Sequence, residues 1–256
     1  MMKHYALIGR TLVHSHSKIL FDGEHFADAD YRLQEMPSVE GLREWVQREA
    51  IDGFNVTIPY KQAVLPLLDA LDESAAAIGA VNCVVVERGA DPRAVRLVGH
   101  NTDAPAFRQT VQALTRSCTQ PLAQAFILGT GGAARAVAYA LAREGVPHTF
   151  VSRTPELHPG AIGYPRLSAF SSQLSTLIVN ATPLGTYPAV EEMPLDPASL
   201  VAAFPRLVVY DLVYNPSITR FQSRAAAAGA ATMGGQTMLR LQAELSWRLW
   251  SLVTGR

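Results

Sequence analysis

The chain has few cysteines, and its histidines form no metal-binding pattern. Two of its 256 residues are cysteines, Cys83 and Cys118, and no Cys-x-x-Cys pattern occurs. We therefore expect two reduced thiols without a role in a site. His14 and His16 lie close together, but no carboxylate stands beside them and no His-Glu-x-x-His pattern is present, so no metal site is expected.

The chain also lacks an excess of charge of either sign and a long hydrophobic run. Lys and Arg total 22 residues, as do Asp and Glu, which argues against nucleic acid or an anionic membrane surface as the main partner. The N-terminal apolar stretch is too short for a signal peptide, and no apolar run is long enough to span a membrane. We expect a cytoplasmic protein with a small-molecule partner, either a monomer or a homodimer.

Short apolar runs alternate with helix-like patterns along most of the chain, which is typical of an α/β protein. The expected strands are 4–9, 31–36, 52–57, 80–86, 95–98, 124–128, 148–152, 176–180 and 207–212. The expected helices are 15–28, 38–49, 60–70, 103–116, 132–145, 197–203, 217–228 and 235–253. Ser38 is a possible cap of the second helix, and the polar stretch 87–93 indicates a hairpin loop.

A glycine-rich turn follows the short buried strand that ends at Leu128. The sequence Gly129-Thr130-Gly131-Gly132-Ala133-Ala134 satisfies Gly-x-Gly-x-x-Gly/Ala and runs directly into a helical pattern. Gly129 would make the tight turn, Gly131 would let the backbone approach a diphosphate, and Ala134 would allow close packing of helix and strand. The free N–H groups and the positive dipole end of the helix favour phosphate, so the turn predicts a dinucleotide site, the alternative being a merely structural tight turn.

The end of the next strand indicates which dinucleotide is bound. An NAD site would place Asp or Glu about 20 residues after the turn to bind the ribose 2′-hydroxyl. Ser152, Arg153 and Thr154 stand there instead, which favours a 2′-phosphate and hence NADP, although Glu156 would oppose phosphate and Arg153 could be a solvated surface residue. Ala181, Thr182 and Leu184 follow a further strand and are assigned to the cofactor rim, unless they form a simple turn.

Four polar motifs before the glycine-rich turn lie where strands end: residues 14–17, 55–61, 79–82 and 99–103. A dinucleotide implies hydride transfer, and reduction of a ketone requires a proton donor near its oxygen. Lys61 and Asp103 are the candidates, with a solvated lysine and a helix N-cap as the alternatives. A helix after Thr57 would place Lys61 near a positive dipole end, which favours loss of the ammonium proton.

In order, seven motifs resemble those of the shikimate dehydrogenase family, from Ile8 to about Ala243. The resemblance implies a two-domain α/β enzyme that reduces 3-dehydroshikimate to shikimate with NADPH, in aromatic amino-acid biosynthesis. Lys61 and Asp103 match the catalytic pair. The residues implied to bind substrate are Ser15, Ser17, Thr57, Asn82, Asn101, Tyr214 and Gln242. Those implied to bind the cofactor are Gly129, Thr130, Gly131, Gly132, Ala133, Ser152, Arg153 and Thr154, with Gly235 and Met238 beside the nicotinamide.

By the same resemblance, residues 1–103 form the substrate domain, closed by the C-terminal helix 235–256, and residues 104–234 form a Rossmann-type NADP domain. The sequence departs from the family pattern at several places: Lys18, Phe21-Asp22, Ala104-Pro105-Ala106, Ser152 and Pro155-Glu156-Leu157. The last departure leaves Arg153 without the extra basic residue found in many relatives. Two alternatives stay open: a quinate dehydrogenase that uses NAD, and a catalytically silent NADP-binding regulator on the same scaffold.

Overall fold

The computed structural model describes residues 2–13, 15–24, 29–89, 94–117 and 121–254. The chain divides into two compact units, one made of Met1–Asp103 with Arg240–Arg256 and the other of Ala104–Leu239. Five expectations fall wholly or partly outside the described residues: those for His14, Cys118, the end of helix 15–28, the loop 87–93 and the end of helix 235–256. Among the described residues, no helix has the length and hydropathy needed to cross a membrane.

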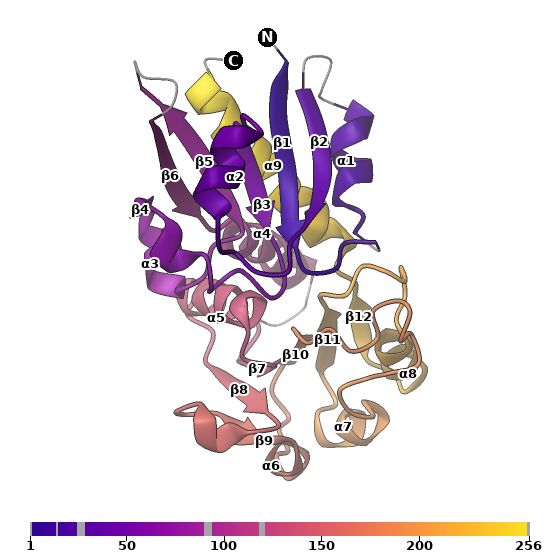
Figure 1. Ribbon diagram of the computed structural model, residues 1–256. Coiled ribbons are helices and arrows are strands. Elements are labelled where there is room, and N and C mark those ends of the chain that lie inside the picture. Colours follow the sequence, from indigo (N-terminus) through magenta and orange to yellow (C-terminus); the bar gives the residue numbers. More distant parts are fainter. Residues whose placement is uncertain (1, 14, 25–28, 90–93, 118–120, 255–256) are drawn as a thin grey trace. The chain divides into compact units, whose positions relative to one another are not determined.

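The first unit is built on one mixed sheet. Its strands are β1 (Lys3–Gly9), β2 (Ala29–Glu35), β3 (Gly53–Val56), β4 (Ala70–Leu71), β5 (Cys83–Arg88) and β6 (Val95–His100). Its helices are α1 (Ser17–Glu24), α2 (Leu42–Arg48), the short 3-10 helix η1 (Leu65–Leu67), α3 (Glu73–Ile78) and most of α9 (Gln236–Thr254). The strand order is β2-β1-β3-β5-β6-β4. Helix α2 packs on one face, and α1 and α9 pack on the other (Figure 1).

Strand directions bring several loops to the same edge of this sheet. Strands β1 and β3 are parallel, whereas β5 is antiparallel to both β3 and β6. The segments after β1, β3 and β6 and the segment before β5 therefore share one edge (Figure 1). The antiparallel pairing of β5 with β6 also confirms the predicted hairpin.

Two expectations for this unit are wrong. No α-helix forms over 60–70: the chain makes a series of turns and then η1. Pro66 lies within η1 and has no N–H to continue a helix, while Leu65 and Leu67 already pack against the core from this short element. Helix α2 begins after Gly41, which has a φ of 71° and no side-chain cap, so Ser38 does not cap it. The short helix α3, capped by Asp72, was not predicted.

Gly53 in β3 has no room for a side chain. A Cβ there would stand 2.5 Å from Nε1 of Trp250, whose ring is 1% exposed and donates from Nε1 to the carbonyl of Val84. Gly53→Ala is therefore expected to lower the free energy of unfolding by about 1–3 kcal/mol, because the ring must move in a packed core. Gly89→Ala is the control, since a Cβ at Gly89 meets no atom within 4 Å. Urea unfolding measures both, and equal stability of the two variants would contradict this packing.

The second unit is built on a parallel sheet. Its strands are β7 (Gln124–Leu128), β8 (His148–Ser152), β9 (Ile162–Gly163), β10 (Thr176–Asn180), β11 (Leu207–Asp211) and β12 (Ala231–Met233). Its helices are α4 (Asp103–Ser117), α5 (Gly132–Arg143), the 3-10 helix η2 (Pro155–Leu157), α6 (Tyr164–Ser168), α7 (Ala198–Ala203) and α8 (Arg220–Ala227). The order β12-β11-β10-β7-β8-β9 is that of a doubly wound dinucleotide-binding sheet, and it confirms the α/β prediction.

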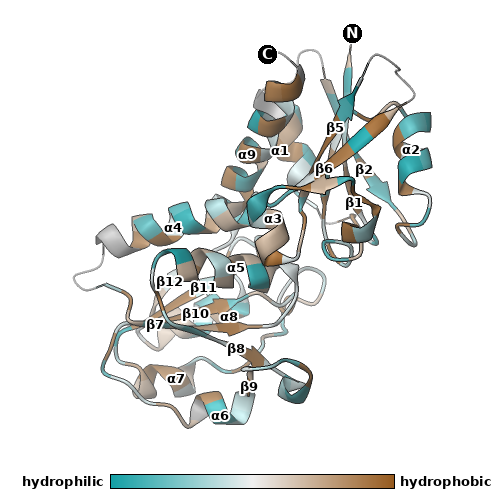
Figure 2. Ribbon diagram, turned by 90° about the vertical axis from the view of Figure 1, so that its left-hand side faces the viewer, coloured by the Kyte–Doolittle hydropathy of each residue, from teal (hydrophilic) through white to brown (hydrophobic). Residues whose placement is uncertain are grey.

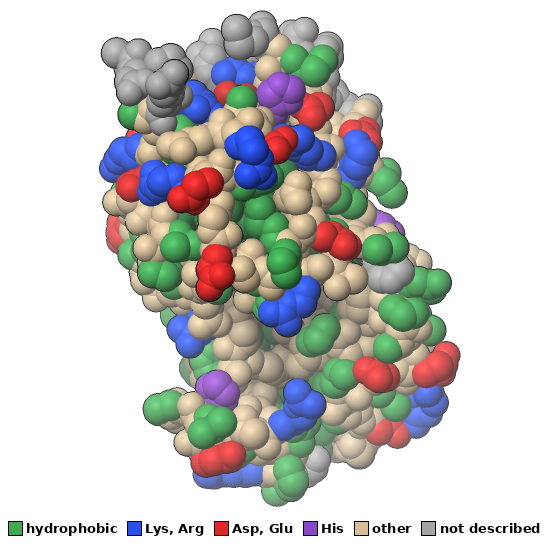
Figure 3. Space-filling model, in the orientation of Figure 1, with side chains coloured by type: hydrophobic (Ala, Val, Ile, Leu, Met, Phe, Trp, Pro, Cys, Tyr) green, Lys and Arg blue, Asp and Glu red, His purple; other side chains and the backbone are tan. Residues whose placement is uncertain are grey.

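The helices of the second unit cover both faces of its sheet. Helices α6, α7 and α8 pack on one face through a cluster that includes Phe126, Ile178 and Phe221. Helix α4 contacts the other face, where Phe107 stacks on Tyr210 with ring centroids 5.2 Å apart. The central strands β7 and β10 are hydrophobic, whereas α4 alternates hydrophobic and hydrophilic residues, as a helix with one solvated side does (Figure 2). Positive and negative side chains are interspersed on the face shown in Figure 3.

Candidate active site

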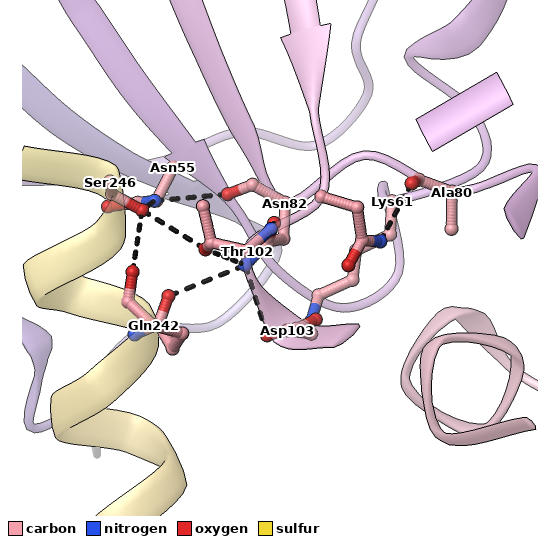
Figure 4. A network of polar contacts seen from close by, with 9 residues as sticks. Asn55, Lys61, Ala80, Asn82, Thr102, Asp103, Gln242 and Ser246 are labelled. Carbon is pink, nitrogen blue, oxygen red and sulfur yellow. Dashed lines mark hydrogen bonds and ion pairs between the residues drawn. The ribbon is translucent and has the colours of Figure 1, made fainter. Parts of the chain in front are cut away.

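An ion pair stands at the sheet edge where β3 and β6 end. Lys61 lies in the turns after β3, and Asp103 is the first residue of α4. Lys61 Nζ lies 2.5 Å from Asp103 Oδ2, and the two side chains are 15% and 8% exposed. The expected helix dipole beside Lys61 is absent because no helix forms there, so the nearest charge that acts on the ammonium is the Asp103 carboxylate (Figure 4).

Asn82 connects this pair to the rest of the edge. Its Nδ2 donates to Asp103 Oδ1 at 3.0 Å and to Thr102 Oγ1 at 2.8 Å, and its Oδ1 accepts from the Thr102 N–H at 2.6 Å. Both carboxylate oxygens of Asp103 are thus occupied by named donors, one charged and one neutral. Asp103 is therefore held in place by side chains, and the simple N-cap alternative does not describe its bonds.

Helix α9 adds two residues to the network. Gln242 Oε1 accepts from Asn82 Nδ2 at 3.4 Å, and Ser246 stands one turn further along the helix (Figure 4). Ser246 Oγ accepts from Asn55 Nδ2 at 2.9 Å and donates to the backbone carbonyl of Gln242 at 2.9 Å. Asn55 and Ser246 were not assigned a role from the sequence. The signals were available: Asn55 opens a polar motif, and Ser246 follows Gln242 by four residues on the same helix face.

The other predicted substrate residues of this unit lie at the same edge. Thr57 follows β3 directly, and its N–H donates to the carbonyl of Ile8 at 3.0 Å. Asn101 follows β6 and donates from Nδ2 to the carbonyl of Ala80 at 2.9 Å. Ser15 and Ser17 stand at the start of α1, where Ser15 Oγ accepts from the Ser17 N–H at 3.3 Å. Tyr214 lies in the second unit, after β11.

Cys83, the first residue of β5, is not a nucleophile. It is fully buried, and burial raises the pKa of its thiol to about 12. The thiol therefore stays protonated at neutral pH, as expected for a structural cysteine. Among the described residues, no group of three or more His, Cys, Asp or Glu side chains is arranged to hold a metal ion.

The glycine-rich turn leads into helix α5 without a side-chain cap. Gly129 has a φ of 106°, and Gly131 is the N-cap of α5 with no side chain bonded to the helix end. The N–H groups of the first helical turn therefore lack a capping acceptor from a side chain. A Cβ on Gly131 would meet no atom within 4 Å, so packing within the described part of the protein does not require a glycine there. Ala134 is fully buried against the strand, as predicted.

The segment after β8 carries the residues expected at the 2′-phosphate. Arg153 and Thr154 are exposed, and Ser152 Oγ accepts from the Thr154 N–H at 3.1 Å. The chain then turns back, so that His158 Nε2 lies 3.1 Å from Thr130 Oγ1 in the glycine-rich turn. The segment that follows Ser152, Arg153 and Thr154 therefore contacts the glycine-rich turn through His158, and the Arg153 side chain is exposed.

The predicted cofactor rim packs beside the glycine-rich turn. Strands β7 and β10 are neighbours, and the N–H of Ala181 donates to the carbonyl of Leu128 at 3.0 Å. A Cβ on Gly129 would lie 3.2 Å from Cγ2 of Thr182. The other residues predicted to bind the cofactor are also in this unit: Thr130, Gly132 and Ala133 in the turn, Leu184 in the rim, and Gly235 and Met238. The strand order reverses between β7 and β10, which is where open α/β sheets bind ligands.

Asp211 ends β11 with no exposed surface, and burial raises its pKa from 3.8 to about 6. A buried acid with a raised pKa contributes stability that is complete below its unfolded pKa and is lost as pH rises through the folded pKa. Asp211→Asn should therefore gain about 1–3 kcal/mol of unfolding free energy over the parent chain at pH 7. The gain should shrink as pH falls from about 6 to about 4. Chemical denaturation across this range measures it, and a gain that grows toward acid pH would contradict the assignment.

Comparisons with known proteins match the chain to one family throughout. A family model described as "Shikimate dehydrogenase substrate binding domain" matches residues 7–84. A shikimate dehydrogenase (NADP(+)) of Desulfitobacterium hafniense strain Y51 is 34% identical, over 98% of this chain and 93% of the relative. A shikimate 5-dehydrogenase of Thermus thermophilus, solved in complex with NADP(H) and shikimate, is 33% identical with a TM-score of 0.80, and the match covers 98% of this chain and 94% of that one.

A quinate dehydrogenase is also similar in structure. The enzyme of Corynebacterium glutamicum, solved in complex with NAD, is 28% identical with a TM-score of 0.77, and the match covers 100% of this chain and 94% of that one. Overall similarity therefore extends to a protein that is named for quinate and was solved with NAD.

Proposed function

Because the chain belongs to the shikimate dehydrogenase family, we propose that its two groups of site residues serve the same reaction. The chain is an NADP-dependent oxidoreductase that interconverts shikimate and 3-dehydroshikimate. The group around Lys61 and Asp103 acts on the substrate. The group around the glycine-rich turn binds the cofactor.

The Lys61–Asp103 pair is the observation that carries the assignment of the chemistry. When bound, NADPH supplies the hydride that reduces the ketone carbon. Negative charge then develops on the ketone oxygen, and we assign Lys61 Nζ as the group that gives it a proton. Asp103 holds the ammonium 2.5 Å away, and Asn82 fixes the other carboxylate oxygen. In the reverse direction, Lys61 receives the proton of the shikimate hydroxyl that is oxidised.

Residues at the same sheet edge bind the ring substituents of the substrate. A polyhydroxylated acid needs donors and acceptors in fixed places, and hydroxyl and amide side chains provide both. We assign this role to Ser15, Ser17, Thr57, Asn82, Asn101 and Gln242. We also assign Tyr214, which lies in the second unit, to the substrate. The bonds of Asn82 to Thr102 and of Asn101 to Ala80 support the assignment, because they fix the two amides before substrate binds.

The cofactor is held by the second unit. The uncapped start of α5 and the open space at Gly131 fit the diphosphate, and the exposed Arg153 fits the 2′-phosphate. We also assign Ser152, Thr154 and residues 129–133 to the cofactor. Ala181, Thr182, Leu184, Gly235 and Met238 form the rim at the nicotinamide. On this proposal Met1–Asp103 with Arg240–Arg256 is the substrate unit and Ala104–Leu239 the NADP unit. A cytoplasmic monomer or homodimer stays a prediction.

Steady-state rates with two substrates and two cofactors test the substrate and cofactor assignment. The expected result is a higher kcat/KM for shikimate with NADP⁺ than for any pair that contains quinate or NAD⁺. A preference for quinate with NAD⁺ would identify the sister activity instead. Tight binding of NADPH without turnover of any substrate–cofactor pair would identify a silent regulator and would contradict the catalytic role assigned to Lys61 and Asp103.

A further inference from the structure

Three polar side chains without solvent exposure meet where β10 and β11 end. Asn180, Asp211 and Thr219 are each 0% exposed. Asp211 Oδ1 accepts from Asn180 Nδ2 at 2.9 Å and from the N–H of Val213 at 3.0 Å, and its Oδ2 accepts from Thr219 Oγ1 at 2.6 Å. Burial of three polar groups is costly unless these bonds are made, so the cluster has one preferred arrangement.

One branch of the cluster leads to the turn 181–184. Asn180 Oδ1 accepts from the N–H of Thr182 at 3.0 Å and from its hydroxyl at 2.6 Å. Asn180 Nδ2 donates to the carbonyl of Leu184 at 3.3 Å as well as to Asp211. Both Thr182 and Leu184 are assigned to the cofactor rim. Their positions therefore depend on Asn180, whose amide is oriented by the Asp211 carboxylate.

The other branch leads to Gly235. The N–H of Val213 is bonded to Asp211, and the carbonyl of Val213 accepts from the N–H of Gly235 at 3.2 Å. A Cβ on Gly235 would overlap the carbonyl of Leu212, so this glycine packs directly on the backbone that Asp211 holds. Tyr214 is the next residue of the same segment. Two separate parts of the rim thus meet at one carboxylate.

We propose that Asp211 is a positioning residue for NADP. Its carboxylate fixes the turn 181–184 and the segment 212–214 with Gly235 in the arrangement that receives the nicotinamide half of the cofactor. The inference rests on the proposed function. Asp211 acts by accepting hydrogen bonds and not by its charge, because the donors of both branches bond to Oδ1 alone. An asparagine keeps Oδ1, and its Nδ2 can donate to Thr219 Oγ1, whose own hydrogen can turn to Gln222 Oε1 at 3.4 Å.

Three variants of the full chain test this inference. Asp211→Ala removes both branches, Asp211→Asn preserves them, and Thr219→Val removes the Oδ2 partner and the α8 cap but leaves Oδ1 untouched. Their dissociation constants for NADPH and for 2′,5′-ADP, a fragment without the nicotinamide, are measured by fluorescence and calorimetric titration. NADPH should bind about tenfold more weakly to Asp211→Ala than to the parent chain. The 2′,5′-ADP constant should change by less than about twofold, since the residues assigned to that half lie on other segments.

Asp211→Asn should restore the NADPH constant of the parent chain, and Thr219→Val should lower the melting temperature with that constant unchanged. Equal weakening of NADPH and 2′,5′-ADP, or failure of asparagine to restore binding, would overturn the proposal. If Asp211→Ala does not fold, Asn180→Ala cuts the first branch alone and is judged by the same ratio of constants. Shikimate oxidation by the parent chain is measured alongside. An inactive parent chain contradicts the proposed function, whereas an active one with NADPH binding unchanged in Asp211→Ala contradicts only this inference.

Discussion

Replacement of Lys61 by glutamine is expected to lower kcat for shikimate oxidation by about 10²- to 10⁴-fold, the range for loss of a general acid–base group. The amide can still donate a hydrogen bond to Asp103, whose carboxylate would otherwise be left without its charged partner. It cannot take up the proton of the reacting hydroxyl. The fall in kcat therefore reports proton transfer more directly than Lys61→Ala does, and initial rates at saturating substrate and cofactor measure it.

A second lysine–aspartate pair provides the control for this prediction. Lys3 Nζ lies 2.9 Å from Asp52 Oδ1, and both residues stand at the opposite edge of the same sheet. Lys3→Gln should leave kcat within about twofold of the parent chain, because an ion pair at this partly exposed site contributes only to stability. If Lys61→Gln kept the kcat of the parent chain while remaining folded, Lys61 would not carry the proton.

Replacement of Arg153 by alanine is expected to raise the KM for NADP⁺ by about 10- to 100-fold, the loss for hydrogen bonds to a charged group. The KM for NAD⁺ should change by less than about twofold, since NAD⁺ has no phosphate at that position. Arg153 is exposed and follows β8, and the segment turns back to Thr130 through His158. Steady-state kinetics with both cofactors give the ratio of the two effects.

Arg143 is a suitable control for this change. It lies in the last turn of α5, at the far end from the glycine-rich turn, with its guanidinium 5.8 Å from the centre of the Tyr139 ring. Arg143→Ala should leave both KM values unchanged. An equal rise in KM for NADP⁺ and NAD⁺ in Arg153→Ala would show that Arg153 does not distinguish the 2′-phosphate.

Local chemistry explains why most elements could be predicted from the sequence. The strand before Gly129 is a buried apolar run, and the glycines after it allow the tight turn into a helix, so β7 and α5 appear within a few residues of their expected places. The helix predicted over 60–70 was wrong because the leucines there are spaced as in a helix but surround Pro66. Helix α3, with six residues, is too short for hydropathic periodicity to be visible.

The sequence predicted which residues belong to the candidate site but not the hydrogen bonds that join them. Lys61 and Asp103 were identified as a pair, yet the sequence could not show that Asn82 bonds Asp103 or that Gln242, 160 residues away, bonds Asn82. Such contacts depend on which strands are neighbours and in which direction they run. The same holds for Asp211, because Asn180 lies 31 residues before it and Thr219 eight residues after it, on other segments of the second unit.

The initial rate of NADP⁺ reduction by shikimate, followed by the absorbance of the reduced nicotinamide, tests the central claim most directly. It is measured for the parent chain and Lys61→Gln, with protein folding checked by circular dichroism. We expect rapid reduction by the parent chain and a rate about 10²- to 10⁴-fold lower for the variant. No reduction by the parent chain, or equal rates for the two proteins, would contradict it.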